Sequence, residues 1–112
     1  IEDKCSEPVL NLGGKTKLLE LAALIDEAKF FLGLDSVSSH IAAAMNTPSV
    51  TLFGPSVSRN WKPWSKRSII IERTGKEEKC PKHYPLGGKF ERCLCYIHPT
   101  KVIESVDKAL KL

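Results

Sequence analysis

Residues 30–55 read FFLGLDSVSSHIAAAMNTPSVTLFGP, and this stretch decides the fold of the chain. The apolar runs at 29–35 and 49–53 are typical of strands that are buried on both faces, as in a parallel sheet. Between them, the small residues at 40–46 predict a short helix that stops at Asn46. A strand, a helix and a second strand in this order predict a βαβ unit.

The same alternation continues on both sides of this unit. Before it we expect a strand at 8–12 and a helix at 16–28 that is capped by Thr16. After it we expect a strand at 68–71 and a last helix over 100–112. The whole pattern predicts an α/β domain with a mostly parallel sheet and flanking helices.

The charge of the chain is unevenly distributed. The 112 residues are enough for one small domain and carry a net charge of +4. Residues 1–55 have a net charge of −3, whereas residues 56–101 have +7. A basic segment attracts phosphates or anionic lipid, although it can also simply keep a long loop soluble. Aromatic residues do not alternate with the basic ones as in nucleic-acid-binding modules, so we expect no nucleic acid partner.

An irregular segment at 72–98 carries three of the four cysteines. Cys80, His83, Cys93 and Cys95 could supply four zinc ligands, although the gap between the last two is tighter than usual. A disulfide from Cys80 to Cys93 or to Cys95 is an alternative. Free thiols are favoured over both, so no metal is expected.

Small polar residues gather where the first apolar run of the βαβ unit ends. In an open α/β sheet, ligands bind outside the carboxyl ends of the strands, which is where Asp35 and Gly54 fall. The helix that follows offers unpaired N–H groups and a partial positive charge. Ser36, Ser38 and Ser39 add hydroxyl donors, and His40 adds a further donor or a positive charge. These residues suit a phosphate site and also simple helix capping, and the two interpretations remain open.

Three motifs occur in order along the chain: GKTKLLELAALI at 14–25, DSVSSHIAAA at 35–44, and FGPS followed by WKPW within 53–64. Together they resemble the C-terminal half of glycosyltransferase family 9, the bacterial ADP-heptose:lipopolysaccharide heptosyltransferases. That family has the GT-B fold, with two Rossmann-like domains and a cleft between them. The resemblance implies that residues 1–112 are a partial C-terminal nucleotide-sugar-binding domain. The first strands of that domain and the whole N-terminal domain would lie upstream.

The resemblance also implies an activity, which is inverting transfer of heptose from ADP-heptose to the lipopolysaccharide inner core. The general base would belong to the N-terminal domain, so no catalytic residue is expected in this chain and the fragment alone should be inactive. No cofactor or bound metal is implied. The expected donor-binding residues are Asp35, Ser36, Val37, Ser38, His40 and Gly54. Val37 stands where many family members have Gly, which puts close approach of the diphosphate to that residue in doubt.

Further contacts and partners are expected at the edges of this site. Thr16 and Trp61 are candidate donor or acceptor contacts, and Trp61 and Trp64 could stack on an adenine or a sugar or pack against the sheet. The family places the protein in the cytoplasm, and the basic segment suggests contact with the cytoplasmic face of the inner membrane or with a phosphorylated acceptor. The alternatives are a non-catalytic nucleotide- or phosphate-binding module and a zinc-stabilised interaction domain.

Overall fold

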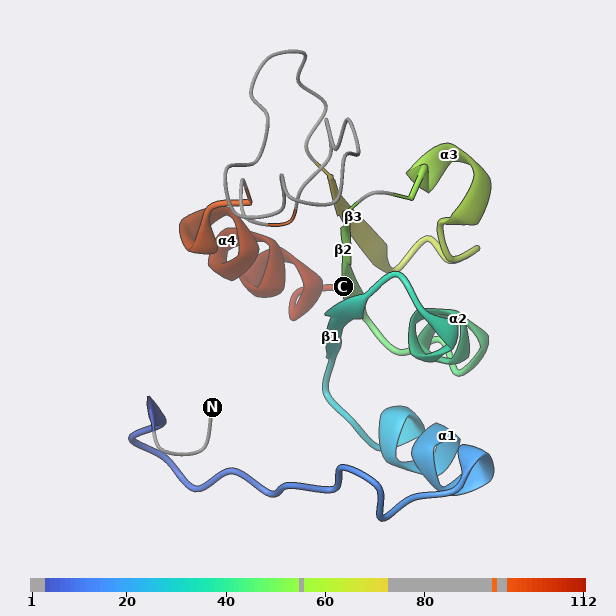
Figure 1. Ribbon diagram of the computed structural model, residues 1–112. Helices are drawn as coiled ribbons and strands as arrows, with labels where there is room; N and C mark the ends of the chain where they lie inside the picture. Colours follow the sequence, from blue (N-terminus) through green and yellow to red (C-terminus); the bar gives the residue numbers. More distant parts are fainter. Residues whose placement is uncertain (1–3, 55, 73–93, 95–96) are drawn as a thin grey trace, which may run out of the picture.

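Three strands form one parallel sheet in the order β1-β2-β3 (Figure 1). The computed structural model describes residues 4–54, 56–72, 94 and 97–112. The strands are β1 (Phe31–Leu34), β2 (Ser49–Phe53) and β3 (Ser68–Glu72). Three of the four predicted strands are therefore confirmed, each within two residues of its expected ends.

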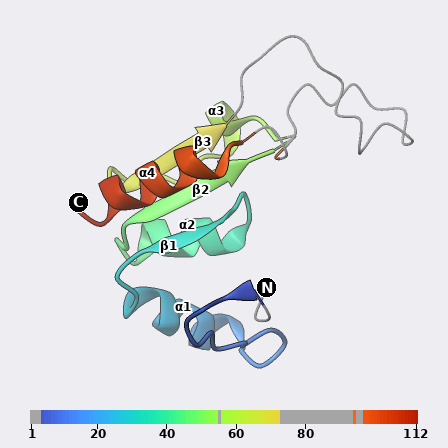
Figure 2. The ribbon, with the colours of Figure 1, turned by 90° about the vertical axis from the view of Figure 1, so that its left-hand side faces the viewer.

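Helices cover both faces of this sheet, as predicted. They are α1 (Leu18–Asp26), α2 (Val37–Ala44), α3 (Ser58–Trp61) and α4 (Pro99–Ala109). In Figures 1 and 2, α4 lies on one face of the sheet, while α2 lies on the other with α1 beside it. The layered α/β architecture expected from the sequence is therefore present.

The face under α4 holds the apolar core. The parallel register aligns Val50 of β2 with Ile69 of β3, so both side chains point to the same face. Val102, Val106 and Ala109 recur at helical spacing along α4 and pack against this face. These three belong to the apolar face expected for this helix, whereas Ile103 and Leu110, which were expected on the same face, are 62% and 50% exposed.

The opposite face combines several small side chains with Phe53 of β2, which is also fully buried. Ser49 and Thr51 of β2 are fully buried, as are Ser39 and Ala42 of α2. Small side chains let the backbone of a helix come close to a sheet. The α2 helix, which carries the polar junction, is thereby held firmly against the strand ends.

Residues 8–12 do not form the predicted strand. They lie outside any regular element, and Leu10 is 79% exposed. An extended segment is stable as a strand only when its N–H and C=O groups pair with a neighbour. Within the described part of the chain, no strand pairs with this segment, so the apolar pattern alone was misleading.

Helix starts were also misplaced. The N-cap of α1 is Lys17 and not Thr16, and the backbone N–H of Lys17 donates to Glu20 Oε2 at 2.7 Å. In α4 the N-cap is His98, whose Nδ1 accepts from the N–H of Thr100 at 3.3 Å. In both helices, a side chain near the N-terminus satisfies an N–H group that the helix leaves unpaired.

Candidate functional site

The carboxyl ends of β1 and β2 are tied together by Asp35. Its backbone N–H donates to the carbonyl oxygen of Leu52 at 3.2 Å, which continues the pairing of the two strands by one residue. Its carboxylate oxygen Oδ2 accepts from the hydroxyl of Ser56 at 2.5 Å. Asp35 is partly buried, so one carboxylate oxygen is fixed at this edge of the sheet.

At the start of α2, the first N–H groups have no hydrogen-bond partner within the described part of the chain. The helix begins at Val37, three residues earlier than expected, and Ser36 is its N-cap in an extended conformation. The Ser36 side chain makes no capping hydrogen bond. Ser39 instead turns inward, and its hydroxyl donates to the carbonyl oxygen of Ser36 at 2.7 Å. Simple side-chain capping therefore does not account for Ser36. Ser36 and Val37 are exposed, and Ser38 is partly buried.

Gly54 is buried at the end of β2, and its environment explains the absence of a side chain. A Cβ atom at this position would lie 3.1 Å from Cγ of Leu94, which is closer than carbon atoms usually approach. A side chain at position 54 would therefore require Leu94 to shift by a few tenths of an ångström. Its predicted contact with a ligand stays a prediction.

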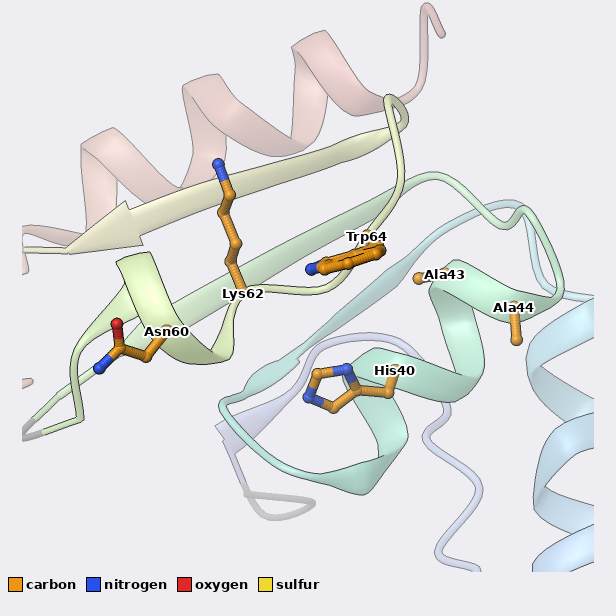
Figure 3. Close-up of a pocket in the computed structure, with 6 residues that line it drawn as sticks. All are labelled: His40, Ala43, Ala44, Asn60, Lys62 and Trp64. Carbon is orange, nitrogen blue, oxygen red and sulfur yellow. The ribbon is translucent and has the colours of Figure 1, made fainter.

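His40 lines a pocket on the outer side of α2. The pocket is open, has a volume of about 380 Å³ and is lined by His40, Ala43, Ala44, Asn60, Lys62 and Trp64 (Figure 3). The structure thus brings His40 together with Trp64, which follows it by 24 residues in the sequence. This pairing was not predicted, because α3 and the turn after it were expected to be loop.

Neither Thr16 nor Trp61 is among the residues that line this pocket. Thr16 is partly buried just before α1, and Trp61 is 60% exposed at the end of α3. Among the residues with described positions, no side-chain hydrogen bond joins either of them to Asp35 or Ser56. Their role as donor or acceptor contacts stays a prediction.

The zinc candidates Cys80, His83, Cys93 and Cys95 lie outside the described residues. In the part of the chain that is described, no group of three or more His, Cys, Asp or Glu side chains comes together to hold a metal ion. In the same part, none of the helices is both long and apolar enough to cross a bilayer. The zinc and disulfide interpretations remain predictions.

Ser56 was predicted only as the last residue of the FGPS motif and was not among the expected donor-binding residues. The structure adds its hydrogen bond to Asp35. Asn60 and Lys62 were missed because their positions depend on the path of the chain between β2 and β3.

Comparison with known proteins gives a consistent result. The model of glycosyltransferase family 9 (heptosyltransferase) matches residues 1–87. Lipopolysaccharide heptosyltransferase 3 of Escherichia coli K12 is 39% identical over 105 residues, which are 94% of this chain and 30% of that protein. Lipooligosaccharide heptosyltransferase 2 of Haemophilus influenzae is 32% identical over 111 residues, which are 98% of this chain and 32% of that protein.

A solved structure shows the same arrangement of elements. It is the E. coli ADP-heptose lipopolysaccharide heptosyltransferase II, which is 30% identical and superimposes with a TM-score of 0.71. The match covers 90% of this chain and 27% of that one. The chain thus spans about a third of the length of the curated relatives it matches.

Proposed function

This chain belongs to glycosyltransferase family 9, the heptosyltransferases, and from that membership we propose that it is the donor-binding part of an inverting transferase. The donor would be ADP-heptose and the acceptor the lipopolysaccharide inner core. The observation that carries the proposal is the hydrogen bond from Ser56 to Asp35, which joins two strand ends beside the open start of α2. In open α/β sheets this edge is where ligands bind.

The start of α2 would hold the diphosphate of the donor. The first N–H groups of a helix have no partner within the helix and carry a partial positive charge. Here they belong to Ser36, Val37 and Ser38, and the first two residues are exposed. Negative charge grows on ADP as it leaves the sugar, and fixed N–H groups stabilise it without having to reorient. An N–H donor does not depend on the side chain, so Val37 can serve where the family often has Gly.

Asp35 suits the sugar better than the phosphates. A carboxylate close to a diphosphate would repel it, whereas it accepts hydrogen bonds from the hydroxyl groups of a sugar. The hydroxyl of Ser56 holds Oδ2 in place and leaves the carboxylate able to accept further hydrogen bonds. Asp35 would then orient the heptose, while α2 binds the leaving group.

The remaining chemistry would come from the N-terminal domain of the same protein, which would supply the general base and the other half of the cleft. The segment after β2 adds exposed cations, namely Arg59, Lys62 and Lys66. These charges support attraction to a phosphorylated acceptor or to the anionic cytoplasmic face of the inner membrane. A cytoplasmic location at that surface follows from this proposal.

The test is a transfer assay on the whole protein that carries this chain, with Asp35→Asn and Ser56→Ala variants. Loss of a hydrogen bond to a charged group costs about 1.5–3 kcal/mol, so we expect kcat/KM to fall by about 10-fold to 100-fold in Asp35→Asn. The kcat/KM of Ser56→Ala should lie between that of Asp35→Asn and that of the unaltered protein. Asp26→Asn, which changes an exposed carboxylate at the end of α1, is the matched control.

Two outcomes would decide against the proposal. Turnover of Asp35→Asn equal to that of the Asp26→Asn control would remove Asp35 from the site. Binding of ADP by the whole protein without any heptose transfer would favour the alternative, a non-catalytic nucleotide-binding module.

A further inference from the structure

Glu72 is a carboxylate at the carboxyl end of β3 that the proposed donor site does not use. Ile71, the residue before it, belongs to the apolar core under α4. Because side chains alternate along a strand, Glu72 points to the opposite face of the sheet, where α2 and α3 lie (Figure 1). Glu72 is partly buried, and its Oε2 atom is buried without a hydrogen-bond partner among the described residues.

Asp35 lies on the same face of the sheet and at the same edge. Its N–H group donates to the carbonyl oxygen of Leu52, which places Asp35 opposite Phe53, the last residue of β2. Phe53 pairs in turn with Glu72. Neighbouring strands are about 4.8 Å apart, so the Cα atoms of Asp35 and Glu72 are roughly 10 Å apart, with the buried Phe53 between them.

The two carboxylates differ in how they are satisfied. Asp35 accepts a hydrogen bond from Ser56. Within the described part of the chain, neither a hydrogen bond nor an ion pair reaches Glu72. Arg67 lies at the other end of β3, where its guanidinium donates to the carbonyl oxygen of Asn46. Buried polar groups nearly always have a hydrogen-bond partner, and an unpaired buried carboxylate destabilises a fold. Glu72 is therefore suited to a hydrogen-bond donor that arrives with a ligand.

We infer that Glu72 is a second carboxylate of the donor site and accepts a hydrogen bond from a hydroxyl group of the transferred sugar. This inference rests on the proposed function, in which α2 holds the diphosphate and Asp35 orients the sugar. The start of α2 follows β1, two strands away from β3, so Glu72 lies apart from the phosphates that would repel it. An ionised carboxylate only accepts hydrogen bonds, and a sugar hydroxyl group can donate one.

The Glu72 side chain can reach a ligand without a change in the backbone. Glu72 is not fully buried, and the last torsion of a glutamate side chain is broad and roughly twofold, so the two carboxylate oxygens can exchange places. This rotation breaks no hydrogen bond of Oε2 within the described part of the chain. The carboxylate can therefore turn toward the edge of the sheet at little cost when a sugar binds.

The test is calorimetric titration of the whole protein that carries this chain, with ADP and ADP-heptose as ligands. Glu72→Gln keeps the length of the side chain and one acceptor oxygen but removes the charge. Since charge-assisted hydrogen bonds are the stronger ones, we expect Glu72→Gln to bind ADP-heptose about fivefold to tenfold more weakly and to bind ADP unchanged. Glu104→Gln, which makes the same substitution at an exposed position of α4, is the matched control.

A stability measurement separates this role from a structural one. Because Glu72 has no partner among the described residues, Glu72→Gln should leave the midpoint of chemical denaturation unchanged or raise it. A lowered midpoint would show that the carboxylate supports the fold, and it would overturn the inference.

Two binding results would also overturn it. One is ADP-heptose affinity of Glu72→Gln equal to that of Glu104→Gln, and the other is an equal loss of affinity for ADP and ADP-heptose. In both cases the unaltered protein still binds ADP, so the donor-site proposal stands. Failure of the unaltered protein to bind ADP would instead remove the donor site, and the role of Glu72 with it.

Discussion

Thr51 is fully buried in the middle of β2, and its hydroxyl has no hydrogen-bond partner among the described residues. A buried hydroxyl without a partner costs about 1–3 kcal/mol. Valine has nearly the same shape and also favours a strand. We therefore expect Thr51→Val to raise the free energy of unfolding by about 1 kcal/mol, as measured by chemical denaturation of the purified protein.

Thr47 provides the control, because the same substitution should have the opposite sign there. Its hydroxyl is also buried but donates to the carbonyl oxygen of Ile25 at 2.9 Å. Thr47→Val would remove that hydrogen bond and destabilise the fold by about 1 kcal/mol. Effects of the same sign at Thr51 and Thr47 would contradict this account.

The contacts of individual residues in the candidate site could be predicted from the sequence only in part. The parallel order of the strands implies that Asp35 and the end of β2 lie at one edge. It does not reveal that Ser56, 21 residues later, donates to Asp35, because that contact depends on the turn after β2. Nor does the sequence show that Gly54 makes room for Leu94, a residue 40 positions away.

The end of α2 depends on Asn46 in a left-handed conformation. Its φ is 58°, and its carbonyl oxygen accepts from Nη1 of Arg67 at 2.8 Å. A residue with a Cβ pays about 1–2 kcal/mol in this conformation, and asparagine pays less than most. We expect Asn46→Ala to lower the free energy of unfolding by about 1 kcal/mol, as measured by denaturation.

Asn46→Gly separates the backbone effect from loss of the side chain. Glycine adopts a positive φ without steric cost. The free energy of unfolding of Asn46→Gly should therefore exceed that of Asn46→Ala by about 1 kcal/mol. Equal loss of stability in both variants would mean that the amide side chain, and not the conformation, matters at this helix end.

The elements show why strands were predicted better than helix ends. The apolar runs at 29–35 and 49–53 correspond to buried strands, whose composition reflects burial directly. The start of α2 was missed because Ser38 and Ser39 are typical of loops, yet the Ser39 hydroxyl bonds back within the helix. The four-residue α3 is too short to leave a periodic pattern.

Across the whole molecule, the apolar core extends beyond the helix that covers it. Leu32 and Leu34 of β1 pair in register with Val50 and Leu52, so all four side chains lie on the face that α4 covers. Over β1 that cover is lacking, and Leu32 and Leu34 are 46% and 52% exposed. These two leucines form an exposed apolar patch on the edge strand of the described sheet, and such patches favour association.

We expect this leucine pair to drive self-association of the 112-residue chain when it is expressed by itself. Burying one leucine contributes about 1.5–3 kcal/mol, so Leu32→Glu should raise the dissociation constant by about tenfold or more, measured by sedimentation. Leu10→Glu is the control, because Leu10 is exposed outside any regular element, and the same charge there should change association little. If both variants weaken association equally, added negative charge and not the β1 surface would be responsible. If Leu32→Glu has no effect, the chain associates through another face.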